Sequence, residues 1–114
     1  MNNAKANVLS QKLDALDRQS PFYVDVRWQG SRKNIIAQVD VGIRPVTVED
    51  FNRRTFSVSG RVQIIVFETL TDIEKNLICR MLCKIAQETG LKNPKLLKIS
   101  DTPYLKHLLV YMFR

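Results

Sequence analysis

The sequence has few of the residues that keep chains unfolded or carry them across membranes. Glycine and proline occur only four times each among 114 residues, which is too seldom for a linker or a low-complexity segment. No apolar run approaches the roughly 18 residues of a membrane-spanning helix, and residues 1–20 contain nothing like the apolar core of a secretory signal. With 45% hydrophobic and 25% charged side chains, the composition predicts one globular domain over residues 1–114, in which residues 1–20 are a candidate helical arm.

Metal-binding and nucleophilic side chains are also scarce. The chain has two cysteines and one histidine, His107, which are too few for a tetrahedral zinc site without carboxylate ligands. Cys79 and Cys83 are four residues apart in a predicted helix, where a disulfide would be strained. We therefore expect two free thiols in a reducing compartment, a cytoplasmic location, and neither a metal nor a cofactor.

The polar residues do not form a pattern that indicates catalysis. Asp25 and Asp40 are expected to face each other across a hairpin. Arg27 and Gln38 share that face, an arrangement typical of an exposed cross-strand patch. A cysteine nucleophile needs a neighbouring base, but His107 lies on a different predicted element, and glycine-rich phosphate loops are missing. The sequence therefore predicts a protein that is not an enzyme.

The spacing of apolar residues predicts an α/β chain in which helices and strands are mixed. Alternation of apolar and polar residues marks the half-buried strands, and a continuous apolar run at residues 62–67 is typical of a central strand. Trp28 falls on an alternating apolar face and is expected in the core. The predicted elements are a helix over residues 4–18, strands over 22–28 and 35–43, a short helix over 47–54, a strand over 61–68, a long helix between Thr71 and Gly90, and strands over 96–100 and 107–113.

The long helix is the most clearly marked element. Thr71 and Glu74 have the spacing of a capping box, and Gly90 suits the position after the helix. A broad apolar stripe that includes Leu77 and Leu82 is expected to pack on the strand over 61–68. A strand, this helix and the strand over 96–100 would form a parallel β-α-β unit. The predicted fold is one mixed sheet with an N-terminal antiparallel hairpin, a β-α-β unit and one long helix packed on the sheet.

The N-terminal helix has a narrower apolar stripe, which allows two interpretations. Such a stripe is adequate for the groove of a partner protein, and it would equally cover the open face of the sheet. The stripe consists of Val8, Leu9, Leu13 and Leu16.

Positive charge is concentrated in the second part of the chain. Residues 75–114 carry eight basic and two acidic side chains, a formal charge of +6, within a total of +7. This asymmetry indicates an acidic partner, either a nucleic acid or a protein surface, or a solvated face that keeps the protein soluble. The residues expected to contact phosphate, if the partner is a nucleic acid, are Arg80, Lys84, Lys92, Lys95 and Lys98.

Residues 61–100 contain a hydrophobic strand that ends at Glu68, a capped helix, a Gly90-Leu91 turn and a second strand. This segment resembles the opening unit of the uracil-DNA-glycosylase-like fold, and within it the psi subunit family of the bacterial DNA polymerase III holoenzyme. The glycosylase turn rich in glycine and proline is replaced by Glu68-Thr69-Leu70, so glycosylase activity is not implied. The hairpin over 22–43 has no counterpart, and residues 1–20 lack the aromatic-rich arm typical of psi.

The resemblance implies a small subunit without enzyme activity, which bridges a clamp loader to a chi subunit that contacts single-strand-binding protein. We therefore expect a non-catalytic adaptor subunit of a larger bacterial-type assembly, related to DNA replication. A basic nucleic-acid-binding module that uses the C-terminal half is the alternative. A protein partner is expected, but neither a membrane nor a small-molecule substrate.

Overall fold

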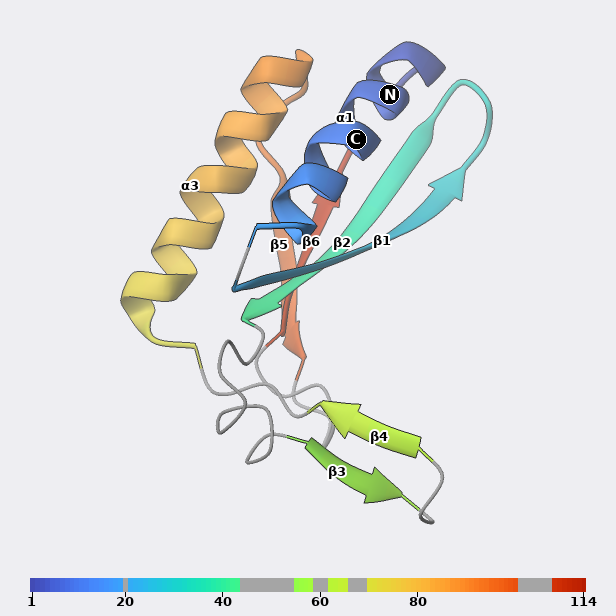
Figure 1. Cartoon of the computed structure of the whole chain (residues 1–114). Coiled ribbons are helices and arrows are strands. Elements are labelled where there is room, and N and C mark those ends of the chain that lie inside the picture. Colours follow the sequence, from blue (N-terminus) through green and yellow to red (C-terminus); the bar gives the residue numbers. More distant parts are fainter. Residues whose placement is uncertain (20, 44–54, 59–61, 66–69, 101–107) are drawn as a thin grey trace.

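A computed structural model describes residues 1–19, 21–43, 55–58, 62–65, 70–100 and 108–114, and it is an α+β fold (Figure 1). This confirms the predicted mixture of helices and strands. The short helix predicted over residues 47–54 lies outside the described residues. The described elements are α1 (Asn3–Asp17), β1 (Phe22–Gly30), β2 (Ile35–Ile43), β3 (Thr55–Val58), β4 (Val62–Ile65), α3 (Asp72–Thr89), β5 (Lys95–Ser100) and β6 (Leu108–Phe113).

Four of the strands form one antiparallel sheet in the order β1-β2-β6-β5. The predicted N-terminal hairpin is present, and its register pairs Val24 with Val41 and Asp25 with Asp40. β6 lies between β2 and β5, and its Tyr111 pairs with Val39 on one side and Leu96 on the other. Because side chains alternate along each strand, residues paired in this way share one face of the sheet.

The predicted parallel β-α-β unit is wrong. β4 pairs with β3 in a separate two-stranded sheet, and β5 pairs antiparallel with β6, so the strands on either side of α3 belong to different sheets. The apolar run at residues 62–67 predicted a central strand, because such a run can be covered on both faces. β6 is an equally continuous apolar run, and it is the one that lies inside the four-stranded sheet. Only seven residues separate β5 from β6, which is too few for a parallel crossover and suits an antiparallel pair.

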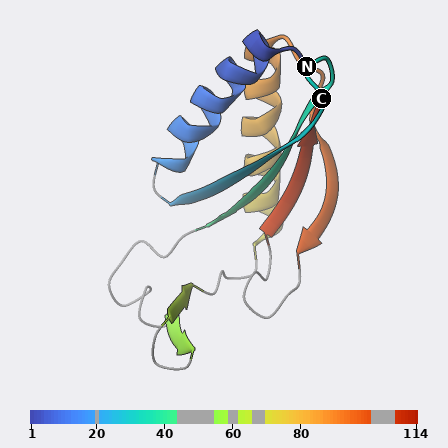
Figure 2. The same cartoon turned by 90° about the vertical axis from the view of Figure 1, so that its right-hand side faces the viewer.

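Both helices pack on the same face of the four-stranded sheet (Figures 1 and 2). The predicted packing of the long helix on the sheet is therefore confirmed. The two helices are antiparallel, since the Lys5 amine donates to the Gly90 carbonyl at 2.9 Å and Lys12 pairs with Glu88 at 2.8 Å. The core between the helices and the sheet contains Leu9, Leu13, Leu16, Val24, Ala37, Val39, Val41, Leu70, Ile78, Leu82, Ala86, Leu109, Tyr111 and Phe113.

The ends of α3 are as the sequence predicts. Thr71 Oγ1 accepts from the Glu74 amide at 3.2 Å, and the Glu74 carboxylate accepts from the Thr71 amide at 3.0 Å. Gly90 has φ +75°, the left-handed conformation that favours glycine. The capping box and the terminal glycine are both confirmed.

The burial of the α3 stripe is only partly as predicted. Ile78 and Leu82 are buried, but Leu77 is 46% exposed and Ile73 is 82% exposed. The prediction that Leu77 is buried is therefore wrong. Successive helix residues are rotated by about 100°, so Leu77 points well away from a face centred on Ile78, Leu82 and Ala86. None of the described helices is long and apolar enough to span a membrane.

Candidate interaction surfaces

The first candidate surface is β5, an edge strand of the four-stranded sheet. Its aliphatic side chains Leu96, Leu97 and Ile99 are exposed, and we call these three residues the β5 edge surface. In the described part of the chain, β6 is the only strand that pairs with β5. An edge strand presents unpaired backbone donors and acceptors to any further strand. The β5 edge surface therefore combines free backbone groups with apolar side chains.

The opposite edge of the sheet, β1, differs in its side chains. Asp25, Arg27 and Gln29 are exposed along it, and α1 packs against the strand. Both edges carry charged side chains, but only β5 also exposes three large aliphatic side chains and lacks a helix packed as α1 is on β1. The two edges therefore offer different surfaces.

The structure places the five predicted phosphate-contacting residues in two groups. Arg80 and Lys84 are exposed on α3, on the side away from Ile78 and Leu82. Lys95 and Lys98 are exposed on β5 and pair with Met112 and Val110 of β6, and the charge of Lys98 acts on Asp40, which lies on the face of the sheet without helices. Lys92 is exposed just before β5. These residues do not converge on one groove.

Most of the predicted partner-binding stripe of α1 faces the core. Leu9, Leu13 and Leu16 are buried against the sheet, and Val8 alone of the four is exposed, at 39%. In this arrangement α1 covers the open face of the sheet, which was the alternative interpretation of the stripe. A partner that bound all four residues would first have to displace the helix from the sheet.

Asp25 and Asp40 do face each other, as predicted, but the patch is not exposed throughout. Asp40 is only 8% exposed, and burial raises the pKa of its carboxyl group. Arg27, with its Nη2 4.0 Å from Asp40 Oδ2, and Lys98 lower this pKa, whereas Asp25 raises it. Burial has the largest effect, so the Asp40 charge is destabilising in the folded protein.

Cys79 and Cys83 are free thiols, as expected, and both are half-buried beside Tyr111. Burial raises the pKa of Cys83, and the neighbouring Cys79 raises it further. A raised pKa keeps this thiol protonated at neutral pH and unsuited to nucleophilic attack. Within the described residues, no three or more His, Cys, Asp and Glu side chains gather as a metal site. His107 lies outside these residues.

The chain matches no known family model, curated protein or solved structure. The resemblance of residues 61–100 to the psi family therefore rests on the sequence pattern alone. The function must be inferred from the surfaces themselves.

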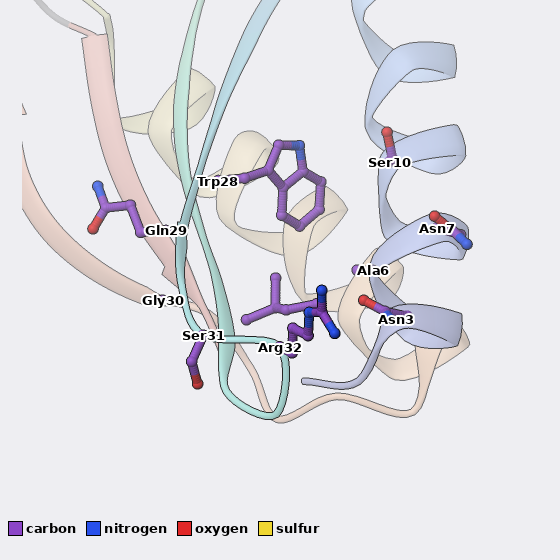
Figure 3. Close-up of a pocket in the computed structure, with 10 residues that line it drawn as sticks. Asn3, Ala6, Asn7, Ser10, Trp28, Gln29, Gly30, Ser31 and Arg32 are labelled. Carbon is purple, nitrogen blue, oxygen red and sulfur yellow. The ribbon is translucent and has the colours of Figure 1, made fainter.

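A pocket of about 430 Å³ lies between α1 and the end of the β1–β2 hairpin (Figure 3). Trp28 lines it and is 42% exposed, so the prediction that Trp28 is a core residue is wrong. The facing residues of α1 are small or polar: Asn3, Ala6, Asn7 and Ser10. Nothing bulky on α1 fills the space beside the indole, and the pocket is the result. We call it the Trp28 pocket.

Sequence reasoning missed this pocket although a signal was present. Asn3, Asn7 and Ser10 have i, i+4, i+7 spacing and so lie along one side of α1. A polar stripe of this kind beside the buried leucines gives the tryptophan that faces it no large apolar side chain of α1 to pack against. Detecting this required knowing that α1 packs on β1 rather than elsewhere on the sheet.

Proposed function

We propose that this protein is a non-catalytic interaction subunit that binds a partner protein through β5. The observation that carries the proposal is the β5 edge surface, where Leu96, Leu97 and Ile99 are exposed on a strand that pairs on only one side in the described residues. An extended segment of the partner adds a strand to this edge. Backbone hydrogen bonds then supply affinity, and the side-chain contacts supply specificity.

The charges beside β5 define the chemistry of the partner segment. Lys92, Lys95 and Lys98 are exposed in or just before the strand. An extended segment with both aliphatic and acidic side chains complements this surface, because opposite charges across an interface speed association and select the partner. The resemblance of residues 61–100 to the psi family supports a place in a bacterial-type DNA-replication assembly, and the free thiols support a reducing cytoplasm.

The proposal is tested by affinity capture from the source cells with quantitative mass spectrometry. In one variant Leu97 and Ile99 are both replaced by Lys, which removes apolar contact and adds charge to the edge. In the matched control, Ile73→Lys and Leu77→Lys make the same chemical change on the exposed side of α3. The partner should be lost with the β5 variant and retained with the control.

Other outcomes contradict the β5 proposal. Loss with the control alone, or equal loss with both variants, would place the interface elsewhere. Light scattering over a range of protein concentrations separates a second copy of the chain from a different partner. A dimer that dissociates in the β5 variant alone would mean that β5 pairs with itself.

The second candidate function is nucleic-acid binding through the basic residues of the second part of the chain. All five predicted residues are exposed, which favours contact with phosphate groups. Binding through them should weaken steeply as salt rises, because neutralised phosphates release counterions. Replacing Arg80, Lys84, Lys92, Lys95 and Lys98 by Ala should weaken binding to all sequences alike. Unchanged binding in this variant would contradict their role.

A further inference from the structure

The Trp28 pocket has walls of different chemistry. Trp28 projects from β1 towards α1, and Figure 3 shows the guanidinium of Arg32 beside Asn3, below the indole. The opposite wall is the polar side of α1, with Asn7 and Ser10. Gln29 and Ser31 also line the pocket, but in this view their side chains point away from it. An aromatic face, a cation and amide groups thus surround one open space.

We propose that the Trp28 pocket binds a nucleobase together with its phosphate group. The indole offers a flat face on which any base can stack. Arg32 supplies the cation for the phosphate, since a guanidinium matches phosphate oxygens in pairs. Asn3 and Asn7 carry both donors and acceptors, which suit the edge of a base. The ligand is either a mononucleotide or one residue of a single-stranded nucleic acid.

The charges of the pocket favour a nucleotide over a neutral sugar. Tryptophan and asparagine also occur where sugars bind, but none of the ten lining residues is acidic, and Arg32 is cationic. In the described part of the chain, Arg32 has no ion-pair partner. A cation that is not neutralised by a neighbouring carboxylate is available to a ligand phosphate. An anionic ligand with a flat ring satisfies both the indole and the guanidinium.

The turn that carries Arg32 is held in place by the backbone. Gly30 has φ +92°, and a Cβ atom there would lie 2.1 Å from the Asn34 carbonyl oxygen, so only glycine fits. Ile35, on the other side of the turn, exchanges two backbone hydrogen bonds with Met1, at 2.9 and 3.1 Å. The backbone that carries the indole and the guanidinium is therefore fixed before a ligand binds, which lowers the entropy cost of binding.

The Trp28 pocket is separate from the β5 edge surface. It lies at the hairpin of β1, and β1 and β5 are opposite edges of the four-stranded sheet. A nucleotide and a partner protein therefore do not compete for the same surface. The inference does not rest on the proposed interaction function, and either one can fail without the other.

Trp28 is the only tryptophan in the chain, so its intrinsic fluorescence reports on this pocket alone. The full chain is titrated with adenosine monophosphate, a short single-stranded oligonucleotide and a neutral oligosaccharide. Stacking of a base on the indole should quench the emission. Quenching by the mononucleotide identifies a nucleotide site, whereas quenching by the oligonucleotide alone identifies a single-strand site. Quenching by neither of these, or by the oligosaccharide alone, would overturn the proposal.

Variants then locate the binding site. Binding is measured by fluorescence anisotropy, with a labelled form of the nucleotide ligand that quenches the Trp28 emission. Trp28→Ala should weaken binding on the order of tenfold, and Trp28→Phe should retain most of it. Arg32→Gln should weaken binding and reduce its salt dependence. The matched control, Lys33→Gln, removes the same charge from a neighbouring residue that does not line the pocket, and it should have the smaller effect.

A variant on the opposite wall tests the pocket without replacing Trp28, in case the Trp28→Ala variant does not fold. Asn7 is exposed on α1, so Asn7→Phe should fill the pocket without disturbing the core, and it should abolish quenching while the melting temperature stays the same. Undiminished binding in the folded Trp28→Ala and Asn7→Phe variants would place the ligand elsewhere and overturn the proposal.

Discussion

The two helices pack on the same face of one sheet, yet they differ in how much of their apolar surface they bury. α1 has few apolar residues, and Ala6, Leu9, Leu13 and Leu16 are all buried. α3 has a broader stripe, but Ile73 and Leu77, in its N-terminal half, are exposed. α1, the helix with the narrower stripe, therefore buries a larger share of its apolar side chains than α3 does.

The difference shows that stripe width and burial are separate quantities. The number of apolar positions on a helix is set by its sequence, whereas the number that can be buried is set by the area of its neighbours. The core of the domain takes in Ile78 and Leu82 but leaves Ile73 and Leu77, which are rotated further around α3, exposed. The number of apolar residues on a helix therefore does not predict how much of the core it forms.

Removal of α1 is the change with the largest expected effect. Deleting residues 1–19 exposes the apolar face of β1 and β2 and takes three buried leucines out of the core. Each buried leucine contributes about 1.5–3 kcal/mol, so we expect a large fall in melting temperature or loss of cooperative unfolding. Unaltered stability together with loss of a captured partner would instead make α1 a docking arm.

Single leucine substitutions compare the two helices directly. Leu13→Ala in α1 and Leu82→Ala in α3 should each lower the free energy of unfolding by about 2–5 kcal/mol, because both side chains are fully buried. Leu77→Ala should change it by less than about 1 kcal/mol, since a half-exposed side chain loses less contact. Urea denaturation of the three variants measures these values. A large loss at Leu77 would contradict the comparison.

The helix cap of α3 is expected to matter less than either buried leucine. Thr71→Ala removes the hydroxyl that accepts from the Glu74 amide and should cost about 1 kcal/mol. Thr71→Ser keeps an acceptor at this position and serves as the matched control. If the Ala and Ser variants unfold at the same urea concentration, the cap does not contribute to stability.

The smallest expected effect lies on the face of the sheet that neither helix covers. Because the pKa of Asp40 is raised in the folded protein, its contribution to stability decreases as the pH rises from the unfolded value near 3.8 through the folded value. Asp40→Asn should therefore stabilise the protein at pH 7 more than at pH 3. Thermal melts of both proteins at the two pH values measure this. A gain at pH 3 that equals the gain at pH 7 would contradict the effect of burial.

Local elements of this fold were predictable from the sequence, but their arrangement was not. The cap at Thr71, the glycine at Gly90 and the hairpin over 22–43 depend on neighbouring residues, and all three are present. The central strand was misassigned because residues 62–67 and 108–113 are both continuous apolar runs. Local periodicity cannot rank two such runs, since the choice depends on which strands pair across the sheet.

In the candidate sites, too, the properties of single residues were predictable from the sequence and their arrangement was not. The exposure of Arg80, Lys84 and the β5 lysines follows from their charge, whereas their separation into two groups depends on the sheet. The β5 edge surface and the Trp28 pocket could not be predicted, because each requires knowing which strand forms an edge or which helix residues face Trp28. Tertiary contacts, rather than local pattern, create both surfaces.

The central position of β6 has a consequence for synthesis of the protein. β6 is the last strand in chain order, yet it separates β2 from β5, so neither strand can join the finished sheet until residues 108–113 have left the ribosome. The hairpin of β1 and β2 emerges much earlier and must wait with the edge of β2 unpaired. Such late long-range pairing slows folding and favours association of nascent chains. A chain truncated before residue 108 should therefore aggregate rather than form a smaller folded domain.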